Sequence, residues 1–246
     1  KNIIFISLFL NTFLFSKSIT IAVSANVSYA IDSLIQEFNK QYPNIEVLTT
    51  TSSSGKLTAQ IVYGAPFDIF MSANMKYPNT LYDKKLAITK PKVYAKGTLA
   101  LFSKNKRDFS NYKEILTNTN IKKIAISNFK IAPYGIAGKE FLTNINLYDK
   151  LKPKFVYGDS VSQTVSYSVR VCDVGLIATS ALYSSKMSMY KQNENWVKLN
   201  SKLYNPIKQG IVILKYAKNN KDARLFYDFI LSNKAKDIFK QFGYKL

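Results

Sequence analysis

The chain has 246 residues, and its 35 Lys and Arg residues outnumber its 15 Asp and Glu residues, which gives a formal net charge of +20. Hydrophobic residues make up 47% of it, a share typical of a globular protein and not of a disordered one. It has no histidine and one cysteine, which excludes histidine-dependent catalysis, histidine or cysteine metal sites and an intrachain disulfide. Because the lysines are spread along the whole chain, the charge alone indicates neither a nucleic-acid-binding nor a membrane-binding surface.

The first stretch, KNIIFISLFLNTFLFSKS, has the composition of a secretory signal peptide. Lys1 precedes an apolar run over residues 3–15, which is shorter than the roughly 20 residues that a membrane-spanning helix needs. We therefore predict a signal peptide over residues 1–18, cleavage near Ser18 and a periplasmic mature protein. Because the cleavage site is not a clean Ala-x-Ala, retention of this segment as an anchor stays an alternative.

The next part of the chain alternates between strand and helix patterns. SITIAVSA is rich in β-branched residues and predicts a buried strand, and NVSYAIDSLIQEFNKQYP places its apolar residues at helical spacing. A strand (NIEVLTTT), a helix (GKLTAQIVYG) and a strand (FDIFMSA) follow. This β-α-β-α-β order is typical of an α/β fold with a mainly parallel sheet flanked by helices.

The same alternation continues to the end of the sequence. It runs through TLALFSK, KEILTNTN, KIAISN, APYGIAGKEFLTNI, KFVYGDS, VSQTVSYSVRV, DVGLIATSA and QGIVILKYA, and closes with helices over KDARLFYDFILSNKAKDIFKQFG. One large sheet is possible, but two smaller lobes are favoured, with chain crossings near residues 94–99 and 204–210. We predict a discontinuous lobe 1 from residues 19–96 and 206–246, and a lobe 2 from residues 97–205.

Four loops share one pattern, because each ends a predicted strand, carries small or polar residues and begins a predicted helix. They are residues 25–28, 52–55, 132–135 and 159–162. Ligands of such folds bind at the carboxyl ends of parallel strands, and helix starts offer free N–H groups and the positive end of the helix dipole. Four such starts facing one cleft would bind an anion without lysine or arginine. Taken singly, each loop is better explained as an ordinary helix cap, and only the four together on one face make an anion site an equal alternative.

Longer motifs resemble those of periplasmic molybdate-binding proteins. TSSSGKLTAQIVYGAPFDIFMSAN matches their serine-rich turn, and IAISNFKIAPYGIAGKEFLTNINLYDKL, GDSVSQTVSYSV and DVGLIATSAL follow in the family's order. The resemblance covers nearly all of residues 19–246. It implies a two-lobed, type II-like periplasmic binding protein fold with the ligand in the interlobe cleft. The implied function is capture of molybdate, and also tungstate, for the membrane permease of an ABC importer, by a monomer that needs no cofactor.

The resemblance also implies which residues hold the oxyanion, all through neutral donors. Carried over by position, they are Ala25, Asn26, Ser54, Tyr134 and Val161, with Tyr134 and Val161 acting through their backbone N–H groups. No residue is implied as a direct ligand of a metal cation, because molybdenum is bound as its oxyanion.

One expected contact is absent from this sequence. Some relatives add a tyrosine hydroxyl from the strand that here reads GLIATSA, and this chain has Ala178 at that place. The sequence leaves open whether Tyr134 or the hydroxyl of Ser53 replaces it.

Neutral donors suit molybdate, which is a dianion without a proton at neutral pH, whereas protonated phosphate needs an acceptor for its proton. A carboxylate in the site would repel molybdate. We interpret Asp68, at the start of a buried strand, as structural, and Asp159 as a helix cap.

Other functions are weighed against this one. An enzyme on the same fold acting on a small anion is disfavoured, because histidine and paired carboxylates are missing and no GxSxG motif surrounds Ser54. Nucleic acid is disfavoured as a partner because the predicted signal peptide exports the protein. Sulfate and phosphate remain alternative ligands, and the sequence does not separate molybdate from tungstate. Cys172 is interpreted as a small buried residue.

Overall fold

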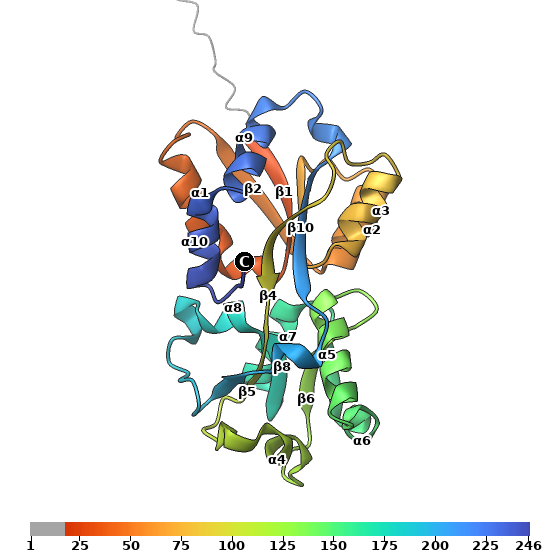
Figure 1. Cartoon of the computed structure of the whole chain (residues 1–246), viewed down its shortest axis with the longest axis vertical. Helices are drawn as coiled ribbons and strands as arrows, with labels where there is room; N and C mark the ends of the chain where they lie inside the picture. Colours follow the sequence, from red (N-terminus) through yellow and green to blue (C-terminus); the bar gives the residue numbers. More distant parts are fainter. Residues whose placement is uncertain (1–17) are drawn as a thin grey trace, which may run out of the picture.

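The computed structural model describes residues 18–246, so the predicted signal peptide lies outside the described residues except for Ser18. Two five-stranded sheets form two lobes stacked along the long axis of the molecule (Figure 1). The strand order is β2-β1-β3-β10-β4 in the first sheet and β7-β6-β8-β5-β9 in the second. The predicted two-lobed α/β architecture is thereby confirmed. No helix within residues 18–246 is long and apolar enough to cross a bilayer.

The first sheet follows the alternation read from the sequence. Its strands and flanking helices are β1 (Ser18–Ser24), α1 (Ile31–Asn39), β2 (Glu46–Ser52), α2 (Ser54–Val62), β3 (Ile69–Ser72), α3 (Lys76–Asp83), β4 (Lys92–Gly97), β10 (Ile207–Ile213), α9 (Lys221–Ile230) and α10 (Asn233–Gln241). β1 pairs in parallel with β2 and β3, whereas β10 is antiparallel to both β3 and β4. Four of the five strands therefore run the same way, and only β10 is reversed.

The second sheet repeats this design. Its elements are β5 (Leu99–Phe102), α4 (Tyr112–Thr117), β6 (Ile124–Ser127), α5 (Pro133–Asn144), α6 (Tyr148–Leu151), β7 (Phe155–Gly158), α7 (Val161–Arg170), β8 (Val174–Ala178), α8 (Thr179–Leu182) and β9 (Trp196–Lys198). β6 pairs in parallel with β7 and β8, and β5 is antiparallel to β8 and β9. The carboxyl ends of the parallel strands in each lobe thus lie at one edge, where loops begin helices.

The chain passes between the sheets twice. β4 of the first sheet continues through Thr98 into β5 of the second, and the segment after β9 leads back into β10. The first passage lies within the predicted crossing region 94–99, and the second, residues 199–206, overlaps the predicted region 204–210. We propose that the lobes divide at these passages, after residue 96 and after residue 205.

Each lobe has its own apolar core, built from the buried faces of its sheet and helices. In lobe 1, Leu34 and Phe38 of α1 pack against Phe226 of α9, with the Phe38 and Phe226 rings 5.0 Å apart. In lobe 2, Ile126 of β6 and Phe141 of α5 are fully buried. Burying one such side chain contributes about 1.5–3 kcal/mol, so the helices are held on the sheets mainly by these contacts.

Five α-helices and strands within the described residues were not predicted from the sequence, namely α3, β4, α6, α8 and β9. The helix α3 carries Pro78 in its first turn, where a proline has no intrahelical N–H to lose. The strand β4 has Lys92 and Lys96 on either side of an apolar Val-Tyr-Ala run. The run of six hydroxyl residues, 49–54, is also divided in the structure. Its first four residues end β2, Ser53 caps α2 and Ser54 is the first residue of that helix.

Candidate functional site

A small cavity of about 10 Å³ lies between the two lobes. The residues that line it come from the four loops singled out in the sequence and from the ends of β1 and β3, and they are Ser24, Ala25, Asn26, Ser53, Ser54, Ala73, Ala132, Pro133, Tyr134 and Val161. All five predicted site residues are among them. Lobe 1 supplies the first three of these five and lobe 2 supplies Tyr134 and Val161.

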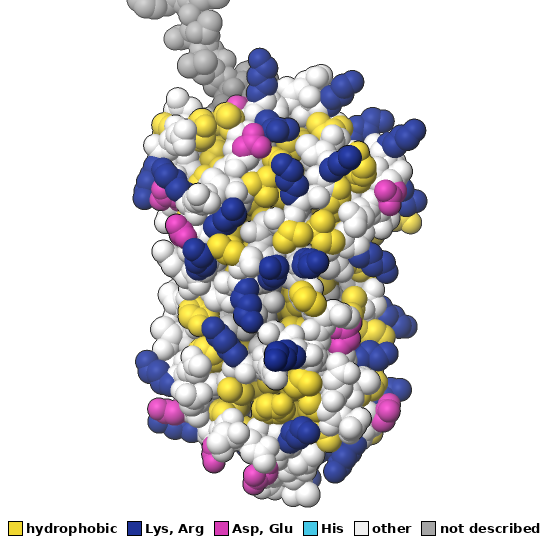
Figure 2. Space-filling model, in the orientation of Figure 1, with side chains coloured by type: hydrophobic (Ala, Val, Ile, Leu, Met, Phe, Trp, Pro, Cys, Tyr) yellow, Lys and Arg dark blue, Asp and Glu magenta, His cyan; other side chains and the backbone are white. Residues whose placement is uncertain are grey.

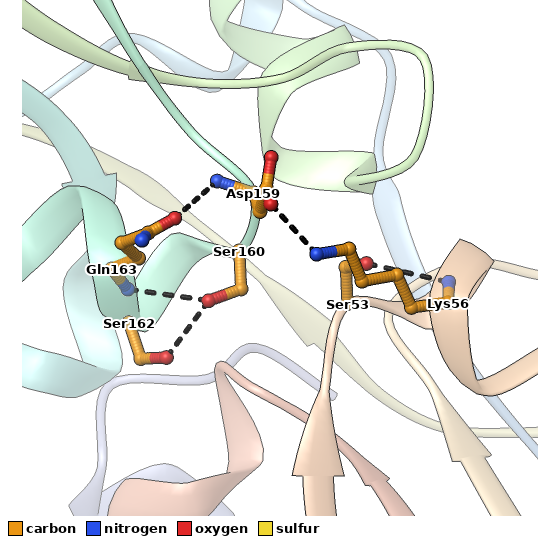
Figure 3. Close-up of polar contacts among 6 residues, drawn as sticks. All are labelled: Ser53, Lys56, Asp159, Ser160, Ser162 and Gln163. Atoms are coloured by element: carbon orange, nitrogen blue, oxygen red, sulfur yellow. Dashed lines mark hydrogen bonds and ion pairs between the residues drawn. The ribbon is translucent and has the colours of Figure 1, made fainter.

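Three of the four loops begin α-helices at the cavity wall. Ser53 caps α2 by accepting a hydrogen bond from the backbone N–H of Lys56 at 3.4 Å, and Ser160 caps α7 by accepting one from Gln163 at 3.2 Å (Figure 3). Pro133 begins α5, where a missing N–H costs nothing. In α2 the N–H of Gly55 is already bound to the carbonyl of Ile131. The N–H groups of Ser54, Tyr134 and Val161, at the helix starts, have no intrahelical acceptor and can donate to an anion. The first loop differs, since it begins with a 3-10 turn, Val27–Tyr29, before α1.

Ser54 presents a fixed hydroxyl to the cavity. Its side chain is fully buried, and its Oγ accepts a hydrogen bond from the backbone N–H of Ala73 at 2.9 Å. Because a hydroxyl can accept and donate at once, this bond leaves the hydroxyl hydrogen free to donate. Ser54 is therefore held in place by lobe 1 as a donor.

Ala25 lines the cavity, but its backbone polar groups have partners in lobe 1. Its N–H donates to the carbonyl of Ser52 at 2.9 Å, and its carbonyl accepts from the hydroxyl of Ser28 at 2.8 Å. Ala25 thus shapes the wall of the cavity, and the donors of this loop must come from residues after it.

The side chain of Asn26 is fully buried and committed to partners other than a ligand. Its Nδ2 donates to Gln209 Oε1 at 2.8 Å and to the hydroxyl of Tyr244 at 2.9 Å, and its Oδ1 accepts from the hydroxyl of Ser24 at 2.9 Å. Asn26 was expected to add its amide to the neutral donors, but both amide hydrogens are used. Any contribution of Asn26 to the site comes from its backbone.

Tyr134 combines a helix-start backbone with a buried hydroxyl. The side chain is 2% exposed, and its hydroxyl has no well-aligned hydrogen-bond partner among residues 18–246. Burial, together with the neighbouring tyrosines, raises its pKa well above the ordinary value, so the group stays neutral. A Cβ added at Gly97 would lie 2.1 Å from this hydroxyl, which places it against the first interlobe passage. Ala178 is buried in β8 opposite Leu99 and outside the cavity lining.

Asp68 and Asp159, the two acidic residues interpreted from the sequence, lie outside the cavity lining. Asp68 is buried, and its carboxylate accepts from the N–H of Thr20 at 2.8 Å and from Asn220 Nδ2 at 3.1 Å, which confirms its structural interpretation. The interpretation of Asp159 as a helix cap is wrong, because Ser160 caps α7. The Asp159 carboxylate instead pairs with Lys56 Nζ across the cleft at 2.7 Å (Figure 3).

The lobes are in contact around the cavity. Besides the pair of Lys56 and Asp159, the N–H of Gly55 donates to the carbonyl of Ile131 at 3.0 Å, and the hydroxyl of Ser180 donates to the carbonyl of Asn26 at 2.9 Å. The cleft is therefore closed in this structure. Within the described part of the chain, no three acidic or cysteine side chains gather as a metal site.

A larger hollow of about 590 Å³ lies elsewhere, on the outer surface of lobe 2 beside α5. Lys139, Glu140 and Lys202 are among the residues that line it, and no residue of the four helix-start loops does. Size alone would point to this hollow as the ligand site, whereas the convergence of helix starts points to the small cavity.

A model of the family described as bacterial extracellular solute-binding protein matches residues 19–245. The chain belongs to this family. The solute-binding protein is 29% identical to the molybdate-binding protein ModA of Azotobacter vinelandii over 230 residues, which cover 93% of this chain and 90% of that protein. It is 31% identical to ModA of Rhodobacter capsulatus over 193 residues, which cover 78% and 74% of the two chains.

A solved structure agrees with these sequence matches. The periplasmic molybdate-binding protein of Azotobacter vinelandii superimposes on this solute-binding protein with a TM-score of 0.86 and 32% identity, over 93% of this chain and 99% of that one. The resemblance to molybdate-binding proteins that the motifs indicated is thereby confirmed. Sequence reasoning missed the partners that hold Asn26 in place, Ser180, Gln209 and Tyr244, because they lie more than 150 residues away and carry no motif.

Proposed function

We propose that this protein captures molybdate in the interlobe cavity and delivers it to the membrane permease of an ABC importer. The observation that carries the proposal is the convergence of helix starts and the Ser54 hydroxyl on one buried cavity that no carboxylate, lysine or arginine lines. The similarity to the molybdate-binding proteins of two bacteria supports it. The protein acts as a periplasmic monomer, and as a carrier rather than an enzyme.

The chemistry of the cavity favours a fully deprotonated tetrahedral dianion. Its polar groups are hydroxyls and backbone N–H groups, which donate hydrogen bonds to oxygen atoms at fixed positions. Protonated phosphate would bring a hydrogen that needs an acceptor, and a buried donor without an acceptor costs about 1–3 kcal/mol. Tungstate has nearly the same size and charge as molybdate, so we propose that it binds as well. Sulfate meets the charge requirement but is smaller.

Ligand binding across the cleft also explains how a permease would distinguish loaded from empty protein. An anion that touches Ser54 of lobe 1 and the helix starts of lobe 2 binds the closed arrangement better than an open one, and this difference shifts the population. The two interlobe passages act as the hinge.

Calorimetric titration of the purified protein with molybdate, tungstate, sulfate and phosphate tests the proposal. We expect one site per chain, with molybdate and tungstate binding at least about tenfold more tightly than sulfate and phosphate. Tightest binding of phosphate, or no binding of any of the four, would overturn it. Small-angle scattering with and without molybdate tests closure, for which a smaller radius of gyration with ligand is expected.

A further inference from the structure

We propose that the C-terminal segment, residues 243–246, positions the ligand-binding loop at Asn26, and that Tyr244 is the positioning residue. This inference rests on the proposed function and adds to it a part of the chain that no cavity-lining residue belongs to. Three sets of contacts carry it: those of Tyr244 with Asn26, those that fix the rest of Asn26, and those that tie the segment to the hinge.

Tyr244 holds Asn26 through two hydrogen bonds made by one hydroxyl group. The hydroxyl donates to the Asn26 carbonyl at 2.8 Å and accepts from Asn26 Nδ2 at 2.9 Å, although the two residues are 218 positions apart. The Tyr244 side chain is 5% exposed, and its ring packs against Phe239 of α10 at 5.3 Å. The hydroxyl is therefore aimed from the core of lobe 1 at a loop that lines the cavity.

The side chain and the carbonyl of Asn26 have further partners. Gln209 and Ser24 engage its side chain from lobe 1, and the hydroxyl of Ser180 donates to its carbonyl from lobe 2. The carbonyl of Asn26 thus accepts from two hydroxyls at once. The same peptide group carries the N–H of Val27, the first residue of the 3-10 turn, and accepting at the carbonyl polarises that N–H as a donor.

The same segment is tied to the hinge. The backbone of Lys245 pairs with that of Lys96 in both directions, at 2.7 and 2.8 Å, and the hydroxyl of Thr98 donates to the carbonyl of Gly243 at 3.4 Å. Lys96 and Thr98 belong to the first interlobe passage. Gly243 has φ +75°, and an added Cβ there would lie 2.6 Å from the ring of Tyr183 in lobe 2, so this turn requires glycine.

These contacts give the two hydroxyls different tasks. When the lobes separate, the bond from Ser180 to Asn26 breaks because its donor lies in the other lobe, whereas Tyr244 stays with lobe 1. Tyr244 therefore keeps the loop in its binding conformation in the open protein, and Ser180 adds its bond on closure. Preorganisation of this kind raises affinity without a contact to the ligand.

The test compares Tyr244→Phe with Tyr227→Phe by calorimetric titration with molybdate. Tyr227 is a buried tyrosine of the same lobe, on α9, remote from the cavity lining. Loss of two buried hydrogen bonds predicts about 5- to 100-fold weaker binding for Tyr244→Phe, and a change of less than about twofold for Tyr227→Phe. Circular dichroism and thermal unfolding show whether both variants are folded at the titration temperature.

A role limited to stability is excluded by a second readout. Tyr244 and Ser180 donate to the same carbonyl, so Tyr244→Phe, Ser180→Ala and the double variant form a cycle in molybdate affinity, and we expect losses that are not additive. Molybdate affinity of Tyr244→Phe equal to that of the wild type, or additive losses, overturns the inference. Failure of the wild type to bind any of the four oxyanions overturns the proposed function instead, which keeps the two results distinguishable.

Discussion

The two lobes touch on two sides of the cavity, and the two contacts differ in kind. Behind the cavity, the bond that Ser180 of lobe 2 makes to Asn26 of lobe 1 is buried, beside the bond that Tyr244 makes to Asn26 within lobe 1. At the cleft mouth, Lys56 and Asp159 form an ion pair whose side chains are 48% and 54% exposed (Figure 3). One contact is protected from water and salt, and the other is open to both.

This difference in exposure decides how much each contact contributes to the stability of the closed arrangement. An exposed ion pair contributes at most about 1 kcal/mol and is screened by salt, whereas leaving a buried polar group without its partner costs about 1–3 kcal/mol. The closed arrangement is therefore stabilised mainly by the buried bond from Ser180 to Asn26 and only weakly by the exposed ion pair of Lys56 and Asp159. We expect substitutions to follow this order, with large effects at buried donors and small ones at the exposed pair.

The largest effect is expected for Ser54→Ala, which removes the buried donor of the cavity. Loss of a hydrogen bond to a charged group costs about 1.5–3 kcal/mol, or roughly ten- to over a hundredfold in molybdate affinity. Titration calorimetry measures it, with Ser168→Ala as the control, because Ser168 is equally buried and hydrogen-bonded but lies outside the cavity lining. An unchanged dissociation constant for folded Ser54→Ala would remove Ser54 from the site.

The next effect is expected for Gly55→Ala, which adds a methyl group between the lobes. That Cβ would lie 2.8 Å from the carbonyl oxygen of Ile131, and backbone in both lobes must shift to accept it. Overpacking of this kind costs about 1–3 kcal/mol. The clash with Ile131 exists only in the closed state, whereas the Tyr77 hydroxyl, 2.9 Å from the added Cβ within lobe 1, is the end of a side chain that can turn away. We expect weaker binding and a smaller scattering change on adding molybdate, whereas Gly138→Ala, whose Cβ meets only flexible side chains at 3.3 Å, should bind normally.

A smaller effect is expected for Lys56→Met, which opens the exposed ion pair but keeps an unbranched side chain. The loss should not exceed about fivefold in affinity and should shrink as salt is raised. Lys40→Met, which breaks an exposed pair with Glu37 within lobe 1, removes the same charge and serves as the control. A larger loss of molybdate affinity for Lys56→Met than for Ser54→Ala would contradict the expectation that the exposed ion pair contributes less than the buried donor.

No effect is expected from pH between about 6 and 8. Tyr134 is the only cavity-lining residue that can ionise, and its burial raises its pKa. A tyrosine with a raised pKa keeps its proton up to a higher pH than usual, so nothing that contacts the ligand titrates in this window. Titrations in buffers of matched ionic strength check this, and a steep change would reveal a titrating group that the closed cavity does not show.

The sequence predicted well what is local. Strand and helix patterns placed three of the four predicted α-helix starts, whereas the first loop begins a 3-10 turn. Because parallel strands end at one edge, the loops that hold Ser54 and Val161 were expected to meet. Among the missed elements, the short helix α3 contains Pro78 and the strand β4 reads Lys-Val-Tyr-Ala-Lys-Gly, and neither has a strong periodic signal.

What the sequence could not supply were the contacts between distant segments. Lys56 and Asp159 are 103 residues apart, and Asn26 and Tyr244 are 218 apart, so no spacing rule joins them. A serine, an asparagine or an aspartate at a helix start is equally suited to cap the helix or to reach a partner. Asp159 was misjudged for this reason, since the cap role fell to its neighbour Ser160.

The contrast between a charged surface and an uncharged cavity separates the rates of capture and release. Lysine and arginine side chains are spread over the visible face of the molecule, and acidic side chains are few there (Figure 2). The residues that line the cavity carry no charge. A positive surface accelerates the diffusional encounter with a dianion, and this gain declines as salt shortens the Debye length, about 10 Å at 0.1 M. Residence time is set instead by buried hydrogen bonds, which salt screens little. The association rate should therefore fall as ionic strength rises, whereas the dissociation rate is set by the buried hydrogen bonds of the cavity and should depend little on salt.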